Sequence, residues 1–142
     1  KKMLNIRTQN YGVKINNIRK IFSNDLHTWS LVQKQMKIRI IYILQPTVTL
    51  TKREPTENER QIIKYEKKRI KNYFQKDFTT KKVYVEAKNF IEKECKKNSI
   101  EFYDSNKLII NTDKNKDFFI DFSHLSVYGN SFIAKCIKNI IN

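Results

Sequence analysis

A carboxylate and an imidazole lie close together near the end of the chain, in residues 121–130. Asp121 precedes His124, which is one of only 2 histidines in the sequence. A carboxylate that holds the Nδ1 proton of a histidine fixes the ring tautomer and leaves Nε2 free to accept a proton. Asp121 and His124 are therefore candidates for a catalytic pair, in which His124 would be the base and Asp121 its orienting partner.

The neighbouring polar residues allow other interpretations. Asp121 could instead cap a turn, with His124 a half-buried side chain, and Asp104 is an alternative carboxylate for a triad. Ser123 and Ser126 are too close to His124 in sequence to approach it in line, so we interpret them as a loop residue and a helix cap. The run Phe118, Phe119 and Ile120 before the pair is predicted to be buried.

The pattern Asp-x-x-His-Leu-Ser-x-x-Gly-Asn, followed by Phe-Ile-Ala, resembles the last conserved block of the SGNH (GDSL-type) hydrolases. A second match lies upstream, in residues 40–47, Ile-Ile-Tyr-Ile-Leu-Gln-Pro-Thr, with Lys52 and Glu59 after them. It is similar to a strand, a Gln-Pro turn and a loop with Lys and Glu that many bacterial members contain. Together the matches cover about residues 38–142, the C-terminal half of a typical SGNH domain.

The resemblance implies ester chemistry. In this family the Asp and His of the last block complete a triad with a serine on an early Gly-Asp-Ser turn, so the chain would supply Asp121 and His124 to a serine esterase or O-acyltransferase. Small-molecule or glycan esters are the implied substrates, and no cofactor or metal is implied. The sequence contains no Gly-Asp-Ser. We therefore expect the nucleophile on an N-terminal segment or on a second chain.

The resemblance also implies an α/β three-layer sandwich with a parallel sheet, SGNH-hydrolase or flavodoxin-like and incomplete at its N-terminus. Residues 1–142 are then a single domain or the C-terminal part of one. Hydrophobic periodicity itself predicts the order helix, strand, helix, helix, strand, helix. The predicted ranges are 25–37, 38–44, 57–74, 80–97, 100–103 and 127–141, with residues 1–22 unassigned. Functional groups gather at the C-terminal ends of parallel strands, where Asp104 and the Asp121 loop should lie.

Smaller features carry weaker expectations. We interpret Ser23-Asn24-Asp25 as a helix start. Gln45 could line the cleft, but the simpler interpretation is a turn residue before Pro46. Lys52 and Glu59 are candidates for an ion pair between a loop and a helix. Cys95 and Cys136 lack a metal-binding spacing, and we expect both to be reduced and buried.

Composition leaves two other functions open. Lys and Arg number 29 against 14 Asp and Glu, a net charge of +15 that would attract polyanions such as nucleic acid. The lysines are spread along helices beside glutamates, however, which is typical of a hydrated surface. The other alternative is a binding or assembly module with a vestigial motif. The longest apolar run, residues 38–44, is well below the roughly 20 residues of a membrane span. We expect no signal peptide, and the sequence does not indicate a cellular compartment.

Overall fold

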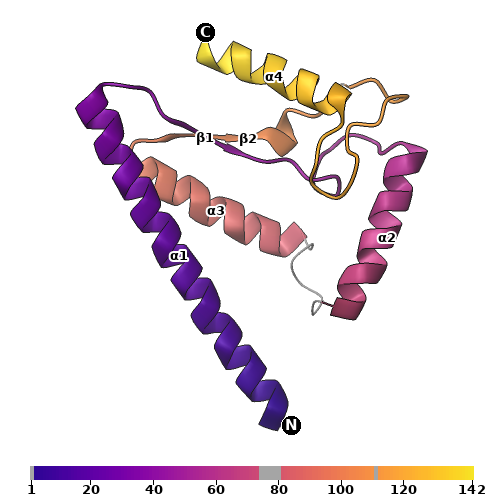
Figure 1. Ribbon diagram of the computed structural model, residues 1–142, viewed down its shortest axis with the longest axis horizontal. Helices are drawn as coiled ribbons and strands as arrows, with labels where there is room; N and C mark the ends of the chain where they lie inside the picture. Colours follow the sequence, from indigo (N-terminus) through magenta and orange to yellow (C-terminus); the bar gives the residue numbers. More distant parts are fainter. Residues whose placement is uncertain (1, 74–80, 111) are drawn as a thin grey trace. The chain divides into compact units, whose positions relative to one another are not determined.

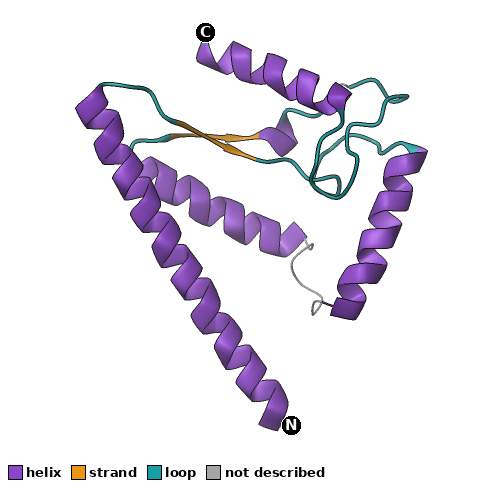
Figure 2. Ribbon diagram, viewed as in Figure 1, coloured by secondary structure: helices purple, strands orange, loops and turns teal. Residues whose placement is uncertain are grey.

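The computed structural model describes residues 2–73, 81–110 and 112–142. The helices and strands follow the predicted order (Figure 1). Their bounds are α1 Lys2–Met36, β1 Ile41–Leu44, α2 Glu57–Tyr73, α3 Lys81–Lys97, β2 Glu101–Asp104 and α4 Val127–Ile141, with a short 3-10 helix, η1 Ser105–Lys107. Irregular segments connect β1 to α2 and η1 to α4, and they carry most of the residues of the candidate site (Figure 2).

Strands β1 and β2 pair as a small parallel sheet of two strands. All four residues of β1 are apolar, Ile-Tyr-Ile-Leu, and each is partly buried. An apolar sequence on both faces suits a parallel strand that is covered on both sides. The mixture of helices with a parallel strand pair confirms the α/β class of the prediction.

One compact unit consists of Lys1–Tyr42 and Ile91–Phe102. Its core contains Leu26, Cys95 and Ile100, against which Phe22, Tyr42 and other side chains pack. The rings of Phe22 and Tyr42 meet edge to face, with 5.6 Å between their centroids. The helix start predicted at Ser23-Asn24-Asp25 is wrong, because α1 runs through these residues. Ser23 Oγ instead donates to the carbonyl oxygen of Arg19 within the helix, at 3.0 Å.

The other compact unit consists of Ile43–Phe90 and Tyr103–Asn142. Its core is formed by Val48, Ile109, Phe118, Phe119 and Ile133. Phe118 and Phe119 are buried as predicted. The prediction that Ile120 is buried is wrong, since 66% of its surface is exposed. Ile120 lies on the arm just before the chain reverses, where its amide donates to the carbonyl oxygen of His124 and its side chain faces solvent.

The two cysteines are unpaired. Burial, with a smaller contribution from Glu94, raises the pKa of the Cys95 thiol to about 11, so it stays protonated at neutral pH. Cys136 is only partly buried, in contrast to the prediction, and burial also raises its pKa. A protonated thiol is a poor nucleophile, and Cys95 packs in the core with Leu26 and Ile100.

Candidate functional site

Residues 117–126 form a tight loop whose two arms are hydrogen-bonded to each other. The amide of Ile120 donates to the carbonyl oxygen of His124 at 3.0 Å, and the amide of Ser126 donates to that of Phe118 at 2.9 Å. Phe119 and Leu125 form an antiparallel bridge between these two bonds. The arms therefore hold the residues of the loop tip, among them Asp121, in a fixed register.

Asp121 and His124 meet at the tip of this loop. Oδ2 of Asp121 lies 2.6 Å from Nδ1 of His124, while Oδ1 accepts the backbone amides of Ser123 at 2.9 Å and of His124 at 2.8 Å. The two backbone amides, first that of His124, lower the pKa of the Asp121 carboxyl to about 2. Asp121 is therefore ionised at neutral pH, as an acceptor for the Nδ1 proton must be.

The remaining ring nitrogen of His124 is available. Nε2 has no hydrogen-bond partner among the residues that the structure describes, and 71% of the His124 side chain is exposed. With the Nδ1 proton held by Asp121, Nε2 presents a lone pair that can accept a proton from an incoming group. The predicted pair thus comes together, in the geometry that orients a histidine base.

Two residues of the segment after β1 hold the tip of the loop. Nε2 of Gln45 donates to the carbonyl oxygen of Ser123 at 2.8 Å, and the amide of Val48 donates to that of Phe122 at 3.1 Å. Pro46 between them is buried. Gln45 is therefore more than the turn residue of the sequence-based interpretation, because its side chain fixes the residue next to His124.

Glu59, in the first turn of α2, holds the base of the loop. Its Oε1 accepts the amides of Phe118 at 2.7 Å and of Phe119 at 3.0 Å. Its Oε2 accepts the amide of Thr56 at 2.9 Å and forms a buried ion pair with Nη1 of Arg53. The predicted pairing of Glu59 with Lys52 is therefore wrong. Lys52 is exposed, whereas the preceding strand and turn bring the next residue, Arg53, into the interior.

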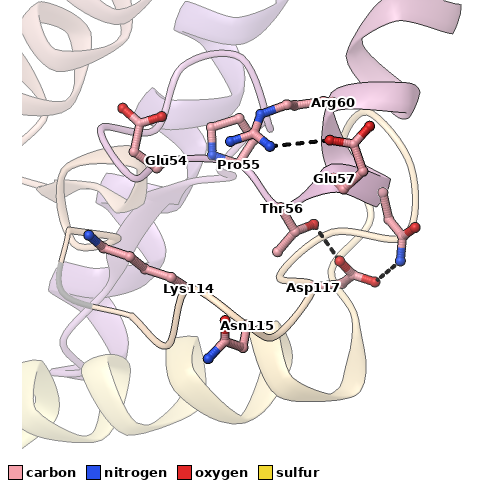
Figure 3. Close-up of a pocket in the computed structure, with 9 residues that line it drawn as sticks. Glu54, Pro55, Thr56, Glu57, Arg60, Lys114, Asn115 and Asp117 are labelled. Atoms are coloured by element: carbon pink, nitrogen blue, oxygen red, sulfur yellow. Dashed lines mark hydrogen bonds and ion pairs between the residues drawn. The ribbon is translucent and has the colours of Figure 1, made fainter.

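A second connection joins the start of α2 to the same arm of the loop (Figure 3). The carboxylate of Asp117 accepts the hydroxyl of Thr56 at 2.5 Å and Nδ2 of Asn58 at 2.8 Å. These two donors lower the pKa of Asp117. They lie at a pocket of about 440 Å³ in which Glu57 is paired with Arg60 at 3.2 Å. Asp117 and Glu57 already have partners within the chain, so we assign these carboxylates to supporting the loop.

The first turn of α4 packs directly on the loop base. Oγ of Ser126 accepts the amide of Gly129 at 3.0 Å, which confirms Ser126 as the predicted helix cap. The same hydroxyl donates to the carbonyl oxygen of Asp117 at 2.6 Å. Gly129 is buried against Phe118, as expected for a residue that permits close backbone approach.

A pocket of about 500 Å³ lies beside His124. This volume is within the range of small-molecule sites. None of its lining residues other than His124 carries a charge at any ordinary pH, although the chain as a whole is strongly basic. The other lining residues are Ile43, Gln45, Pro46, Ser105, Ile120, Leu125, Asn130 and Ile133. A neutral, largely apolar group can therefore lie next to the imidazole.

Asp104, the alternative carboxylate, is engaged elsewhere. It is buried, and its oxygens accept the hydroxyl of Tyr84 together with the amide and Nδ2 of Asn106. Burial and the Asp104 carboxylate raise the pKa of Tyr84 well above its usual range. The carboxylate that orients His124 is therefore Asp121, and Asp104 stabilises the turn after β2.

No serine in the described part of the chain donates its hydroxyl to His124. Ser105 lines the same pocket, but its hydroxyl donates to the carbonyl oxygen of Leu44 and its side chain is buried. Ser126 is occupied as the cap of α4. The site thus places an imidazole, with a carboxylate on its Nδ1, beside a pocket of about 500 Å³.

Sequence reasoning missed Arg53, and it named Glu59 and Gln45 without predicting that they contact the loop. The spacing of Thr56 and Glu59 is a helix capping box, and both bonds of that motif are present, with the amide of Glu59 donating to Oγ1 of Thr56 at 3.2 Å. That signal marks where α2 begins, but it does not reveal that the second carboxylate oxygen reaches residues 118 and 119.

Among the described residues, no group of three or more His, Cys, Asp or Glu side chains is arranged to hold a metal ion. Among the helices in this part of the chain, none has the length and hydropathy of a membrane-spanning segment. No protein-family model matches the chain, and no curated protein matches it.

Proposed function

We propose that this chain supplies the Asp–His pair of an SGNH-type serine esterase or O-acyltransferase. The observation that carries the proposal is the 2.6 Å contact between Oδ2 of Asp121 and Nδ1 of His124, with Nε2 unpartnered in the described part of the chain. The neutral pocket at His124 supports it, because an uncharged ester would meet little electrostatic barrier there. The Asp-x-x-His-Leu-Ser-x-x-Gly-Asn pattern supplies the resemblance to that family.

In the proposed reaction Nε2 of His124 takes up and returns a proton twice, once in each acyl-transfer step. Nε2 first takes the proton of a serine hydroxyl as its oxygen attacks the ester carbonyl carbon, while Asp121 stabilises the imidazolium. The imidazolium then gives this proton to the departing alkoxide, and an acyl-serine remains. Water, or a sugar hydroxyl in a transferase, gives its proton to Nε2 as its oxygen attacks the acyl carbon. The bond to the serine oxygen then breaks, and Nε2 returns the proton to that oxygen, which restores the serine and the neutral imidazole.

The nucleophilic serine is proposed to come from a polypeptide segment outside this sequence or from a second chain. That polypeptide would also add strands to the sheet and complete a three-layer α/β sandwich. The small size of the sheet supports this part of the proposal: β1 and β2 each have one neighbour in the described part of the chain, and sheets usually have about 4 to 6 strands.

Labelling with a fluorophosphonate probe, followed by intact-mass analysis, tests the function. The chain is tagged and purified with its bound partners from the cells that produce it. We expect an adduct on a second polypeptide, and we expect His124→Ala to slow labelling by about 10³-fold or more while leaving folding intact. His27→Ala is the matched control, because His27 is the other of the 2 histidines and is exposed on α1.

Other outcomes have distinct meanings. Labelling at an unchanged rate in His124→Ala would exclude His124 as the base. An adduct on this chain would assign the nucleophile to one of its own serines. Absence of any adduct would favour the binding or assembly module with a vestigial motif.

The net charge of +15 favours one competing function, the binding of nucleic acid. Binding that depends on phosphate contacts is strongest at low salt and falls steeply as salt is added. A titration with a short duplex at low ionic strength therefore separates the two functions. Absence of binding there would exclude the competing function.

A further inference from the structure

We infer that Glu59 is a positioning residue for the Asp121–His124 pair, through its contacts with the backbone of the loop. This inference rests on the proposed function, since it names the residue that holds the proposed catalytic pair. Glu59 is 0% exposed, although a buried carboxylate is costly to keep in a protein. The hydrogen bonds of the buried Glu59 carboxylate show which backbone groups it holds in place.

The carboxylate supplies the acceptor for two consecutive amides of the loop. Oε1 of Glu59 accepts the amides of Phe118 and Phe119, at 2.7 and 3.0 Å, and both phenylalanines are buried. A buried amide without an acceptor is costly, because it loses its hydrogen bonds to water without replacement. Oε1 of Glu59 therefore stabilises the backbone conformation in which the amides of Phe118 and Phe119 both point toward the start of α2.

The cross-strand contacts carry this arrangement to the catalytic pair. Phe119 is bridged to Leu125, and the carbonyl oxygen of Phe118 accepts the amide of Ser126. With residues 118 and 119 fixed on one arm, residues 125 and 126 are fixed on the other. The short tip between the arms then brings Asp121 onto the amides of Ser123 and His124.

A carboxylate at this position serves two sets of donors at once, whereas holding the loop needs only one acceptor oxygen. Glu59 receives donors on both oxygens, because Oε2 faces the amide of Thr56 and the guanidinium of Arg53. Ionised carboxylates accept on both oxygens, whereas an amide would turn its own donors toward one set of partners. Arg53 is itself fixed, with Nε donating to Oγ1 of Thr112 at 2.9 Å and Nη2 to the carbonyl oxygen of Lys116 at 3.1 Å.

A matched pair of uncharged variants tests the inference without any need for activity. Arg53→Met with Glu59→Gln keeps one acceptor oxygen for Phe118 and Phe119, whereas Arg53→Met with Glu59→Met removes it at similar volume. The readout is a ¹³C NMR titration of the Asp121 carboxyl, because its pKa reports the loop amides that it accepts. Loss of global stability alone does not change this pKa in the folded protein.

We expect the pKa of Asp121 to stay near its wild-type value of about 2 in the Gln variant, and to rise toward 3.8 in the Met variant. Equal values in the two variants would overturn the inference. If the Met variant does not fold, Glu59→Asp replaces it. This change keeps the charge opposite Arg53 but shortens the side chain, so a rise is again expected and an unchanged value overturns the inference.

This result and the labelling result are independent of each other. The titration can succeed while fluorophosphonate labelling fails, in which case Glu59 holds the loop of a pair that is not catalytic. Labelling that depends on His124, together with an insensitive Asp121 titration, would support the function and reject the role of Glu59.

Discussion

Gly129 and Phe118 meet backbone to backbone: a β-carbon on Gly129 would lie 2.2 Å from the carbonyl oxygen of Phe118. The same oxygen accepts the amide of Ser126. The first turn of α4 thus rests on the arm of the loop that Glu59 holds from the other side. Glycine at this position is a requirement of the site, although glycine ordinarily weakens a helix.

Gly129→Ala should therefore destabilise the protein, against the usual trend. Glycine to alanine in an exposed helix stabilises by about 1 kcal/mol, whereas forcing atoms into a packed position costs about 1–3 kcal/mol. Urea unfolding measures the change. Ser131→Ala, at an exposed position nearby on the same helix, is the control and should stay within about 0.5 kcal/mol of wild type. A gain in stability for Gly129→Ala would contradict the contact.

Asp121→Asn should lower stability in a way that depends on pH. The carboxyl has a pKa of about 2 in the folded protein, below the ordinary value of 3.8. Its ionised form therefore stabilises the fold fully above about pH 4, and this contribution is lost as the pH falls through about 2. The effect should be modest, because Asp121 is half exposed and solvent screens it.

Denaturant unfolding of wild type and Asp121→Asn at pH 7 and near pH 3 measures this dependence. The difference in stability between them should shrink toward acid. Asp25→Asn, on the exposed surface of α1, serves as the control for general charge effects. A difference that is constant over this range would contradict the hydrogen bonding at Asp121.

Arg53 and Glu59 should show strong coupling in a double-mutant cycle. Removing one partner of a buried ion pair leaves the other charge uncompensated and costs about 3–5 kcal/mol, whereas removing both is far less costly. We expect Arg53→Met alone to be more destabilising than Arg53→Met combined with Glu59→Gln. Urea unfolding of the four proteins gives the coupling energy. Additive effects would show that the two side chains do not interact.

Gln45→Met should loosen the tip of the loop with little effect on global stability. The variant keeps the length of the side chain but removes the donor to the carbonyl oxygen of Ser123, and Gln45 is exposed. We expect the amides of Ser123 and His124 to exchange with solvent several-fold faster, measured by hydrogen exchange. Gln35→Met, on the exposed surface of α1, is the control. Unchanged exchange at Ser123 and His124 would mean that Gln45 does not hold the tip.

The elements with strong periodicity could be predicted from the sequence. The helix predicted at 127–141 has those bounds in α4, and its cap is Ser126. The predicted bounds of β1, α2, α3 and β2 differ from those in the structure by a few residues at most. The start of α1 was mispredicted, because Ser23-Asn24-Asp25 reads as a helix cap although the turn before it is helical as well. Local capping residues mark a boundary only where the preceding backbone leaves the helix.

Asp121 and His124 are only three residues apart, so a local turn can bring them together, and their proximity could be predicted from the sequence. The residues that hold this turn from elsewhere in the chain could not be predicted in the same way. Glu59 reaches Phe118 and Phe119, and Gln45 reaches Ser123, across separations of about sixty residues or more. Such contacts depend on how α2 and the segment after β1 pack against the loop, and many pairings of polar side chains are compatible with the same sequence pattern. The same holds for the cation that faces Glu59. The tertiary packing buries Arg53 and leaves the neighbouring Lys52 exposed, and the sequence pattern alone does not distinguish the two.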